Sequence, residues 1–163
     1  MKISFPNKSI LLAVVFLFMA VSCKKDDDGG FHQISAIETQ IHNRINDFRE
    51  SQGLNRLVLQ PIMFGEARIH SDRMANGTIP VGGEGIDERF TAIKDKIGGT
   101  AQGWVVLKSP YANADTIVKY MTSDTSTVKI ITQTYTQSGV GVSYDDKGDA
   151  YVTHLFLNIP DKK

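Results

Sequence analysis

The chain changes its hydrophobic period near the C-terminus, and this change limits the folds that it can adopt. Three earlier segments carry apolar residues at helical spacing: Ile37, Ile41, Ile45 and Phe48; Met63, Ala67, His70 and Met74; and Ala114, Ile117, Val118 and Met121. From residue 140 the spacing falls to two on both sides of a polar turn at 145–149, as in a β-hairpin. Helices that precede antiparallel strands predict an α+β fold, in which helices pack around a small antiparallel sheet.

Local signals place the beginnings of two predicted helices. Ser35 and Glu38 fit a capping box, and Pro61 suits the first turn of the next helix. Residues 87–97 are expected to form a short helix and residues 123–131 a short helical turn or loop. We expect residues 104–107 to be a buried strand with Trp104 in the core, whereas stacking of Trp104 on a sugar or lipid is the alternative.

An apolar segment, residues 10–21, follows the basic N-terminus and ends just before Cys23. It is shorter than the roughly 20 apolar residues that span a bilayer, so residues 1–22 are expected to be a cleaved signal peptide. Residues 20–23 resemble a bacterial lipobox. The resemblance implies that Cys23 carries palmitate-type acyl chains as a membrane anchor, because two or more chains hold a protein stably. An ordinary signal peptide with an incidental cysteine is the alternative.

A charged linker, residues 23–33 with the acylated Cys23 included, follows the predicted signal. Its segment Lys24–Asp28 resembles the surface-export signal of Bacteroidetes lipoproteins, which implies a lipid-anchored, outward-facing protein of the cell outer membrane. A generic solvated tether is the alternative and leaves a periplasmic orientation open. Residues 34–160 are then expected to form one domain.

Charge balance and cysteine content exclude several kinds of function. The chain has 18 basic and 18 acidic residues, and the predicted leader removes two lysines, so no basic excess is present to bind nucleic acid. Once Cys23 is acylated, no thiol remains for a disulfide, a metal site or a nucleophile. The domain must therefore be stabilised by a packed core.

A series of short motifs resembles bacterial members of the CAP superfamily, which includes cysteine-rich secretory, antigen 5 and pathogenesis-related 1 proteins. The motifs lie at residues 44–49, 53–57, 67–75, 85–89, 139–142 and 151–156. Residues 67–75 match the form Ala-x-x-His-Ser-x-x-Met-Ala. The likeness covers residues 36–158 and implies an α-β-α sandwich with a central cleft.

Many CAP proteins place two His and two Glu in this cleft, where they can bind a divalent metal. In this chain the loop His of the family falls on Gly83, one Glu falls on Gln102 and another His falls on Ser126. Neutral Gln and Ser are poor substitutes for Glu and His as metal ligands. The resemblance therefore implies a CAP-like domain that has lost its metal site and has no other cofactor.

Two of the four histidines are candidates for the cleft. His70 lies on an apolar stripe four residues after Glu66, and this pair could ligate a metal or transfer a proton. A buried His70 bonded to backbone or hydroxyl groups is the structural alternative. His154, on a predicted strand, could approach the same cleft or be a packed core residue, and His42 is expected on a solvated helix face.

These features predict a non-enzymatic lipoprotein of the cell envelope. It would bind a protein, lipid or glycan through its cleft or loops, and the cleft candidates are His70, Glu66, Gly83, Gln102, Ser126 and His154. A protease-like hydrolase that uses His70 and Glu66 as acid and base is the alternative, because protease activity has been proposed for some CAP members. A purely structural surface protein would carry the same sequence signature.

Overall fold

The computed structural model describes residues 33–160, so the predicted signal, Cys23 and nearly all of the linker lie outside the described residues. The elements in chain order are α1 (Ala36–Ser51), β1 (Val58–Leu59), α2 (Pro61–Ala75), α3 (Ile86–Ile97), β2 (Gln102–Ser109), α4 (Ala114–Ser123), α5 (Thr125–Ile131), β3 (Gln137–Tyr144) and β4 (Ala150–Leu157). The strands form one sheet in the order β1-β3-β4-β2. No helix within residues 33–160 is both long and apolar enough to cross a bilayer.

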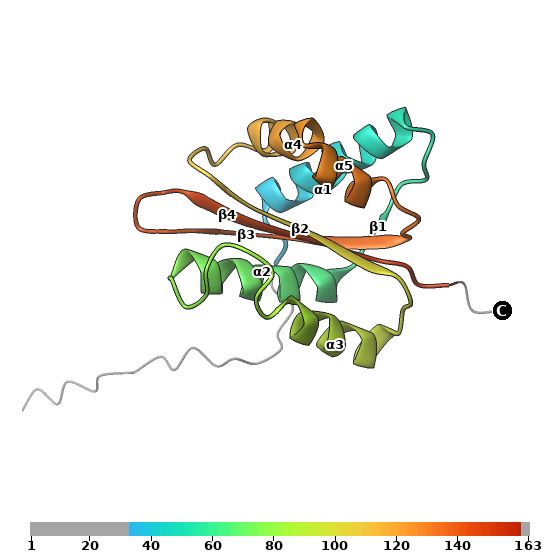
Figure 1. Cartoon of the computed structure of the whole chain (residues 1–163), viewed down its shortest axis with the longest axis horizontal. Coiled ribbons are helices and arrows are strands. Elements are labelled where there is room, and N and C mark those ends of the chain that lie inside the picture. The colour runs from blue at the N-terminus through green and yellow to red at the C-terminus, as the bar shows by residue number, and fades with distance from the viewer. Residues whose placement is uncertain (1–32, 161–163) are drawn as a thin grey trace, which may run out of the picture. The chain divides into compact units, whose positions relative to one another are not determined.

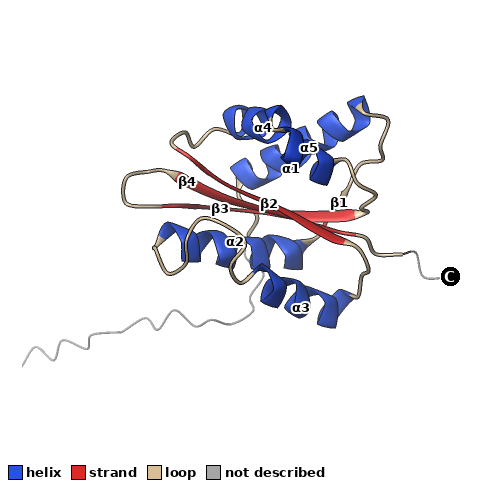
Figure 2. Ribbon diagram, viewed as in Figure 1, coloured by secondary structure: helices blue, strands red, loops and turns tan. Residues whose placement is uncertain are grey.

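The helices cover both faces of the sheet. Figure 1 shows α1, α4 and α5 on one face and α2 and α3 on the other, and Figure 2 shows the strands as the middle layer. This arrangement confirms the predicted α+β class and the α-β-α sandwich. Strand β1 pairs parallel to β3, so the sheet is not wholly antiparallel as the sequence predicted.

Alternate residues of the central strand β4 belong to different cores. Val152 and Phe156 pack with the helices of the α1, α4 and α5 layer. Leu155 and Leu157 pack with α2 and α3. Since side chains alternate across a strand, His154 faces the α1 layer and Thr153 faces α2. The sheet therefore separates groups that lie next to each other in the sequence.

Two glycines let helix α2 lie directly against strand β3. A Cβ at Gly139 would stand 2.3 Å from the backbone carbonyl carbon of Met63, and one at Gly141 would stand 2.1 Å from the backbone nitrogen of Arg68. Real Cβ atoms do not approach other atoms so closely. The Gly-Val-Gly-Val alternation thus has a packing reason, because the valines fill the α1 side and the glycines admit the helix backbone.

A buried carboxylate joins α1, α2 and β3. Glu38 is fully buried and accepts hydrogen bonds from the backbone nitrogens of Ser35 at 2.8 Å and Val142 at 3.1 Å, and it forms an ion pair with Arg68. The Ser35 hydroxyl completes the predicted capping box. Burial acts to raise the pKa of Glu38, but these bonds, led by the one from Arg68, lower it overall.

Candidate functional site

The predicted cleft lies along β2, which forms one end of the sheet. Gln102 is the first residue of β2, Gly83 lies in the loop between α2 and α3, and Ser126 lies in the first turn of α5. These three positions therefore come from the edge strand and from both helical layers. What these positions can bind depends on the side chains that fill the space between them.

An indole ring takes the space into which a side chain at position 83 would project. A Cβ at Gly83 would lie 2.6 Å from Cζ2 of Trp104 and 2.7 Å from Cη2, so the loop passes directly over the ring. The expectation that Trp104 belongs to the core is wrong, because 38% of its surface is exposed. Where the family carries a loop histidine, this chain thus presents an aromatic ring.

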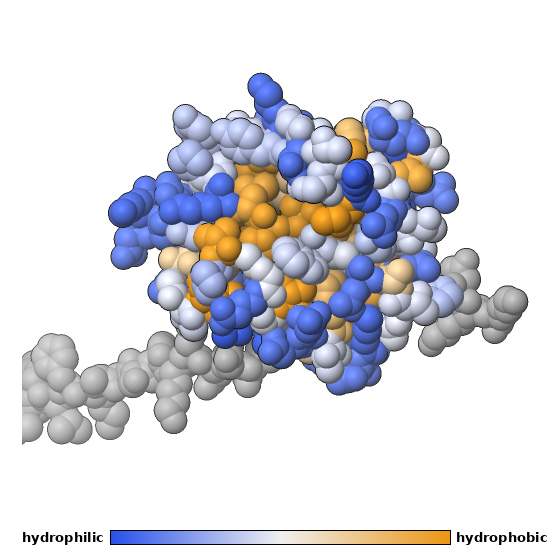
Figure 3. Space-filling model, viewed as in Figure 1, coloured by the Kyte–Doolittle hydropathy of each residue, from blue (hydrophilic) through white to orange (hydrophobic). Residues whose placement is uncertain are grey.

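A pocket of about 350 Å³ opens beside this ring. Its lining residues come from β2, α5 and the segment after α5: Gln102, Gly103, Trp104, Ile130, Gln133 and Tyr135. Figure 3 shows apolar residues exposed across the middle of this face. The lining contains aromatic rings and amides but no carboxylate and no imidazole, which suits an uncharged ligand.

The amides of the pocket are already oriented by neighbours. Gln102 accepts a hydrogen bond from the Lys94 ammonium through its side-chain oxygen. The side-chain oxygen of Gln133 accepts one from the Tyr135 hydroxyl at 3.3 Å. Neither side-chain –NH₂ group has a hydrogen-bond partner within residues 33–160, and such groups can donate to a ligand oxygen.

Ser126 belongs to a helix cap and is absent from the pocket lining. Its hydroxyl donates to the Asp124 carboxylate, which also accepts from the backbone nitrogen of Thr127 at 2.7 Å. The hydrogen bond from Ser126, followed by those from Thr127, lowers the pKa of Asp124 to about 2. An anionic cap residue stabilises the start of α5.

His70 is buried and both of its ring nitrogens have partners. Nε2 lies 3.0 Å from the Glu84 carbonyl oxygen and Nδ1 lies 2.8 Å from the Thr153 hydroxyl. A carbonyl can only accept, so Nε2 carries the proton and Nδ1 accepts from Thr153. Burial lowers the pKa of His70, which favours this neutral form. The ring ties the α2–α3 loop to the sheet and leaves no free nitrogen for a substrate.

The predicted acid–base pair is not formed. Glu66 accepts a hydrogen bond from Arg89 at 3.0 Å and so joins α2 to α3. No hydrogen bond between Glu66 and His70 is present among the described residues. The orientation that general acid–base work would need is therefore missing from this pair.

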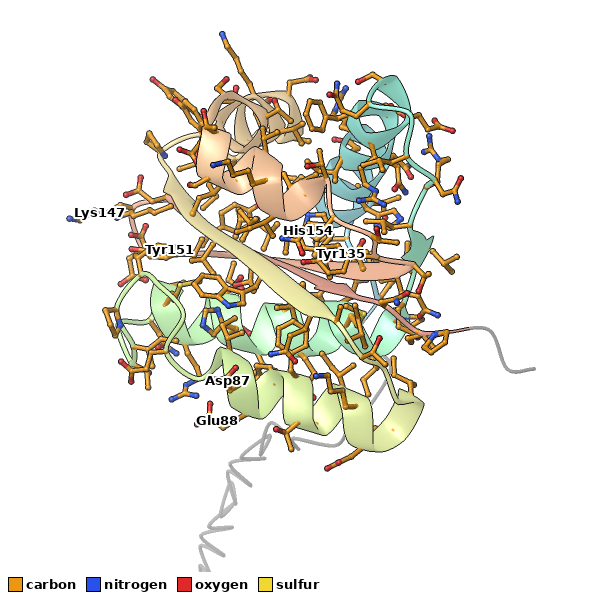
Figure 4. The ribbon with its side chains drawn as sticks, turned by 45° about the vertical axis from the view of Figure 1, so that its right-hand side comes forward. Asp87, Glu88, Tyr135, Lys147, Tyr151 and His154 are labelled. Atoms are coloured by element: carbon orange, nitrogen blue, oxygen red, sulfur yellow. The ribbon has the colours of Figure 1, made fainter. Side chains whose placement is uncertain are left out.

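His154 lies on the opposite face of the sheet from His70, so the two do not share a cleft. It is fully buried, and neither ring nitrogen has a hydrogen-bond partner within residues 33–160. The ring stacks on Phe156 with centroids 4.1 Å apart, and Figure 4 shows His154 and Tyr135 between the sheet and α5. Burial, followed by the nearby His42 and Arg49, holds the pKa of His154 well below its usual range.

His42 is also in the interior, although it was expected on a solvated helix face. Only 4% of its surface is exposed. Nδ1 lies 3.0 Å from the Ser138 hydroxyl and Nε2 lies 3.1 Å from the Asn46 amide. Burial lowers the pKa of His42 to about 4. The polar groups of α1 that face the sheet thus join helix to strand.

The family's metal does not fit the residues present. Within residues 33–160 no cluster of three or more His, Asp or Glu side chains could hold a metal ion. Of the three aligned positions, Gly83 packs against the indole of Trp104, the Gln102 amide is bound to Lys94 and the Ser126 hydroxyl is bound to Asp124. None of these donors matches the anionic and imidazole ligands of a zinc-type site.

Sequence reasoning missed the pocket residues Gln133 and Tyr135. They follow α5 in a segment with no regular period, so nothing in the sequence links them to β2. The available signal was the strand at 102–109 itself, whose outer residues include the only tryptophan of the chain.

Solved structures share this fold at low sequence identity. An outer surface protein from Borrelia burgdorferi matches with a TM-score of 0.65 and 12% identity, over 79% of this chain and 97% of that chain. A cysteine-rich secretory protein from Staphylococcus aureus matches at 0.61 and 14%, over 76% of this chain and 38% of that one. An extracellular SCP-domain protein from Bacillus anthracis matches at 0.59 and 19%, over 76% and 40%. The chain thus spans about two fifths of these last two proteins.

A search of curated protein sequences found no match. The family model of the cysteine-rich secretory protein family, CAP, does match the sequence, over residues 42–156. This range runs from α1 to β4 and includes the edge strand and the pocket. The chain therefore belongs to the CAP family.

Proposed function

We propose that this chain is a non-enzymatic CAP lipoprotein of the bacterial cell envelope that binds an uncharged ligand or partner in the pocket beside β2. The observation that carries the proposal is the lining of that pocket, in which Trp104 and Tyr135 stand beside two glutamines. The Tyr135 ring is buried and stacks on Phe156, so the exposed indole of Trp104 is the aromatic surface that can pack on a sugar ring or an apolar group. Amides bind hydroxyl or carbonyl groups. The His70 ring is hydrogen-bonded to the Glu84 carbonyl and Glu66 is paired with Arg89, and these contacts support a role without catalysis.

The single tryptophan gives a direct assay of the pocket. We expect a saturable change in Trp104 emission when the segment Phe31–Lys163, a compact unit, is titrated with N-acetylglucosamine tetramer or with dodecanol, both of which are uncharged. Gln133→Ala should weaken the response at least fivefold, whereas Gln52→Ala, at the exposed end of α1, should leave it unchanged. An unchanged emission with both probes would remove the pocket from the proposal.

The envelope location rests on Cys23 and on the linker, and is tested separately. We expect Cys23→Ala to abolish labelling of the full chain by a radiolabelled fatty acid. Replacement of residues 24–28 by Gly and Ser should reduce digestion by protease added to intact cells. Persistent labelling would contradict the lipid anchor, and unchanged digestion would contradict the export signal.

A further inference from the structure

The outer edge of β2 has no strand partner. β2 is the last strand of the sheet and pairs only with β4. Within residues 33–160 no other strand, turn or loop makes a backbone hydrogen bond to residues 102–109. Every second residue of this eight-residue strand therefore directs its backbone N–H and C=O away from the sheet.

This edge is apolar and uncovered. Figures 1 and 3 look onto β2, and the apolar surface in Figure 3 runs across the middle of that view, between the two helical layers. Trp104 is exposed, and Val106 and Leu107 are half-buried. Natural proteins usually protect such edges with charge, proline or a covering segment. Residues 103–107 carry no charge and no proline.

Lys108 is the one cationic residue of β2, lies near the end of the strand and is already paired with acidic side chains. Lys108 forms an ion pair with Asp149 at 2.8 Å and lies near Asp145 at 3.6 Å. Its ammonium also lies 5.0 Å from the centre of the Tyr151 ring. The Lys108 ammonium is directed toward the β3–β4 hairpin, so no charged side chain protects the middle of the edge.

The pocket opens beside this edge. Ile130 and Gln133 form its wall from the α5 side, and Gly103 leaves part of its floor without a side chain. The space over Gly103 is filled by Tyr135, whose hydroxyl would lie 2.1 Å from a Cβ there, so the open part of the pocket lies toward Trp104. Helical layers flank the edge strand on both faces, which suits a single extended segment better than a second folded copy with helical layers of its own.

We propose that β2 binds an extended peptide segment of a partner protein by antiparallel strand addition, with an uncharged middle and an apolar side chain directed into the pocket beside Trp104. This inference rests on the proposed binding role and specifies the class of partner. Backbone hydrogen bonds would give affinity, and the pocket would select one side chain in the manner usual for strand addition. Eight residues offer about eight such bonds along about 27 Å of edge.

The strand's own sequence supplies a defined probe. A synthetic peptide of residues 101–109 can pair antiparallel with β2 about Val105. That register sets the peptide's Leu107 opposite Gly103 and its Val106 opposite Trp104, on matching faces. We expect a fluorescein-labelled peptide to bind the segment Phe31–Lys163 saturably, with amide shift changes confined to β2 and the pocket.

Backbone methylation separates strand addition from general apolar binding. Two peptides are N-methylated, one at residues 103, 105 and 107 and the other at 104, 106 and 108, so that each loses the N–H donors of one edge. We expect one of the two to bind at least tenfold more weakly than the other. Val106→Lys in the protein should weaken binding at least tenfold. Val58→Lys, the matched change on the other end strand, should leave it unchanged.

Four outcomes would overturn the inference: no binding of the peptide, equal binding of both methylated peptides, shift changes away from β2, or a solution dimer that Val106→Lys dissociates. The last result would assign the edge to a second copy. If N-acetylglucosamine tetramer or dodecanol changes Trp104 emission while the peptide fails to bind, the proposed function stands and only the peptide inference fails.

Discussion

Replacing His154 by phenylalanine should make the protein more stable, although the residue is central to the core. His154 is fully buried, its two ring nitrogens have no partner, and its ring stacks on Phe156. Phenylalanine keeps an aromatic ring in that stack and removes the unpaired polar atoms. A buried donor or acceptor without a partner costs about 1–3 kcal/mol. Because the phenyl ring is slightly larger, we expect a net gain of about 1–2 kcal/mol at neutral pH.

The gain should increase as the pH falls. Burial holds the pKa of His154 well below its usual range, so the folded protein keeps the ring neutral while the unfolded chain binds a proton below about pH 6.5. Stability is therefore lost as the pH drops through 6.5, by up to about 1.4 kcal/mol per unit for this group. His154→Phe removes this loss, so its advantage over the parent should be about 2 kcal/mol greater at pH 5 than at pH 7.5.

Urea denaturation of the segment Phe31–Lys163 at pH 7.5 and pH 5 measures both effects. His70→Phe is the matched control, because the His70 ring has two hydrogen-bond partners. Its loss leaves the Glu84 carbonyl without this donor and leaves the Thr153 hydroxyl with Ser71 alone. We expect that control to destabilise the protein by about 1–3 kcal/mol at pH 7.5. A destabilised His154→Phe, or an advantage that does not grow at pH 5, would refute the reasoning.

Three further changes test the packing and the site. Gly141→Ala should destabilise the protein by about 3 kcal/mol or more, because α2 must move away from β3 by about 1 Å. Gly77→Ala is the control: its Cβ would meet no described atom within 4 Å, so it should cost about 1 kcal/mol from its positive φ alone. Urea denaturation midpoints measure both effects. Glu38→Gln should cost about 2–3 kcal/mol, since it breaks the pair with Arg68, and an unchanged melting temperature would contradict this. Calorimetric titration with zinc should show no stoichiometric binding, and a tight one-to-one site would contradict the reading of Gly83, Gln102 and Ser126.

Much of the local structure could be predicted because it depends on neighbours in the chain. The capping box of Ser35 and Glu38, the position of Pro61 at a helix start and the turn at 145–149 each need only a few adjacent residues. The order of helices and strands then limits the fold class. The alternation of Gly139 and Gly141 with valines marked a strand, and its family resemblance pointed to the same region.

The candidate site was harder to predict, because it depends on contacts between distant segments. Spacing set Glu66 near His70, but Arg89 binds Glu66 from another helix. Alternation left open which face of the sheet His154 occupies, and the helices that pack there decide it. Period alone did not show that β2 would be an end strand, so Trp104 was wrongly expected in the core.

By itself the sequence determined the kinds of element, their order and the absence of a thiol beyond Cys23. These are properties of composition and of short-range order. Only the tertiary structure decided which polar side chains are satisfied, that the indole of Trp104 lies under Gly83, and that the edge of β2 is open. The physical reason is that burial, pairing and exposure come from packing between segments that are far apart in the chain, and a local pattern of residues carries no record of that packing.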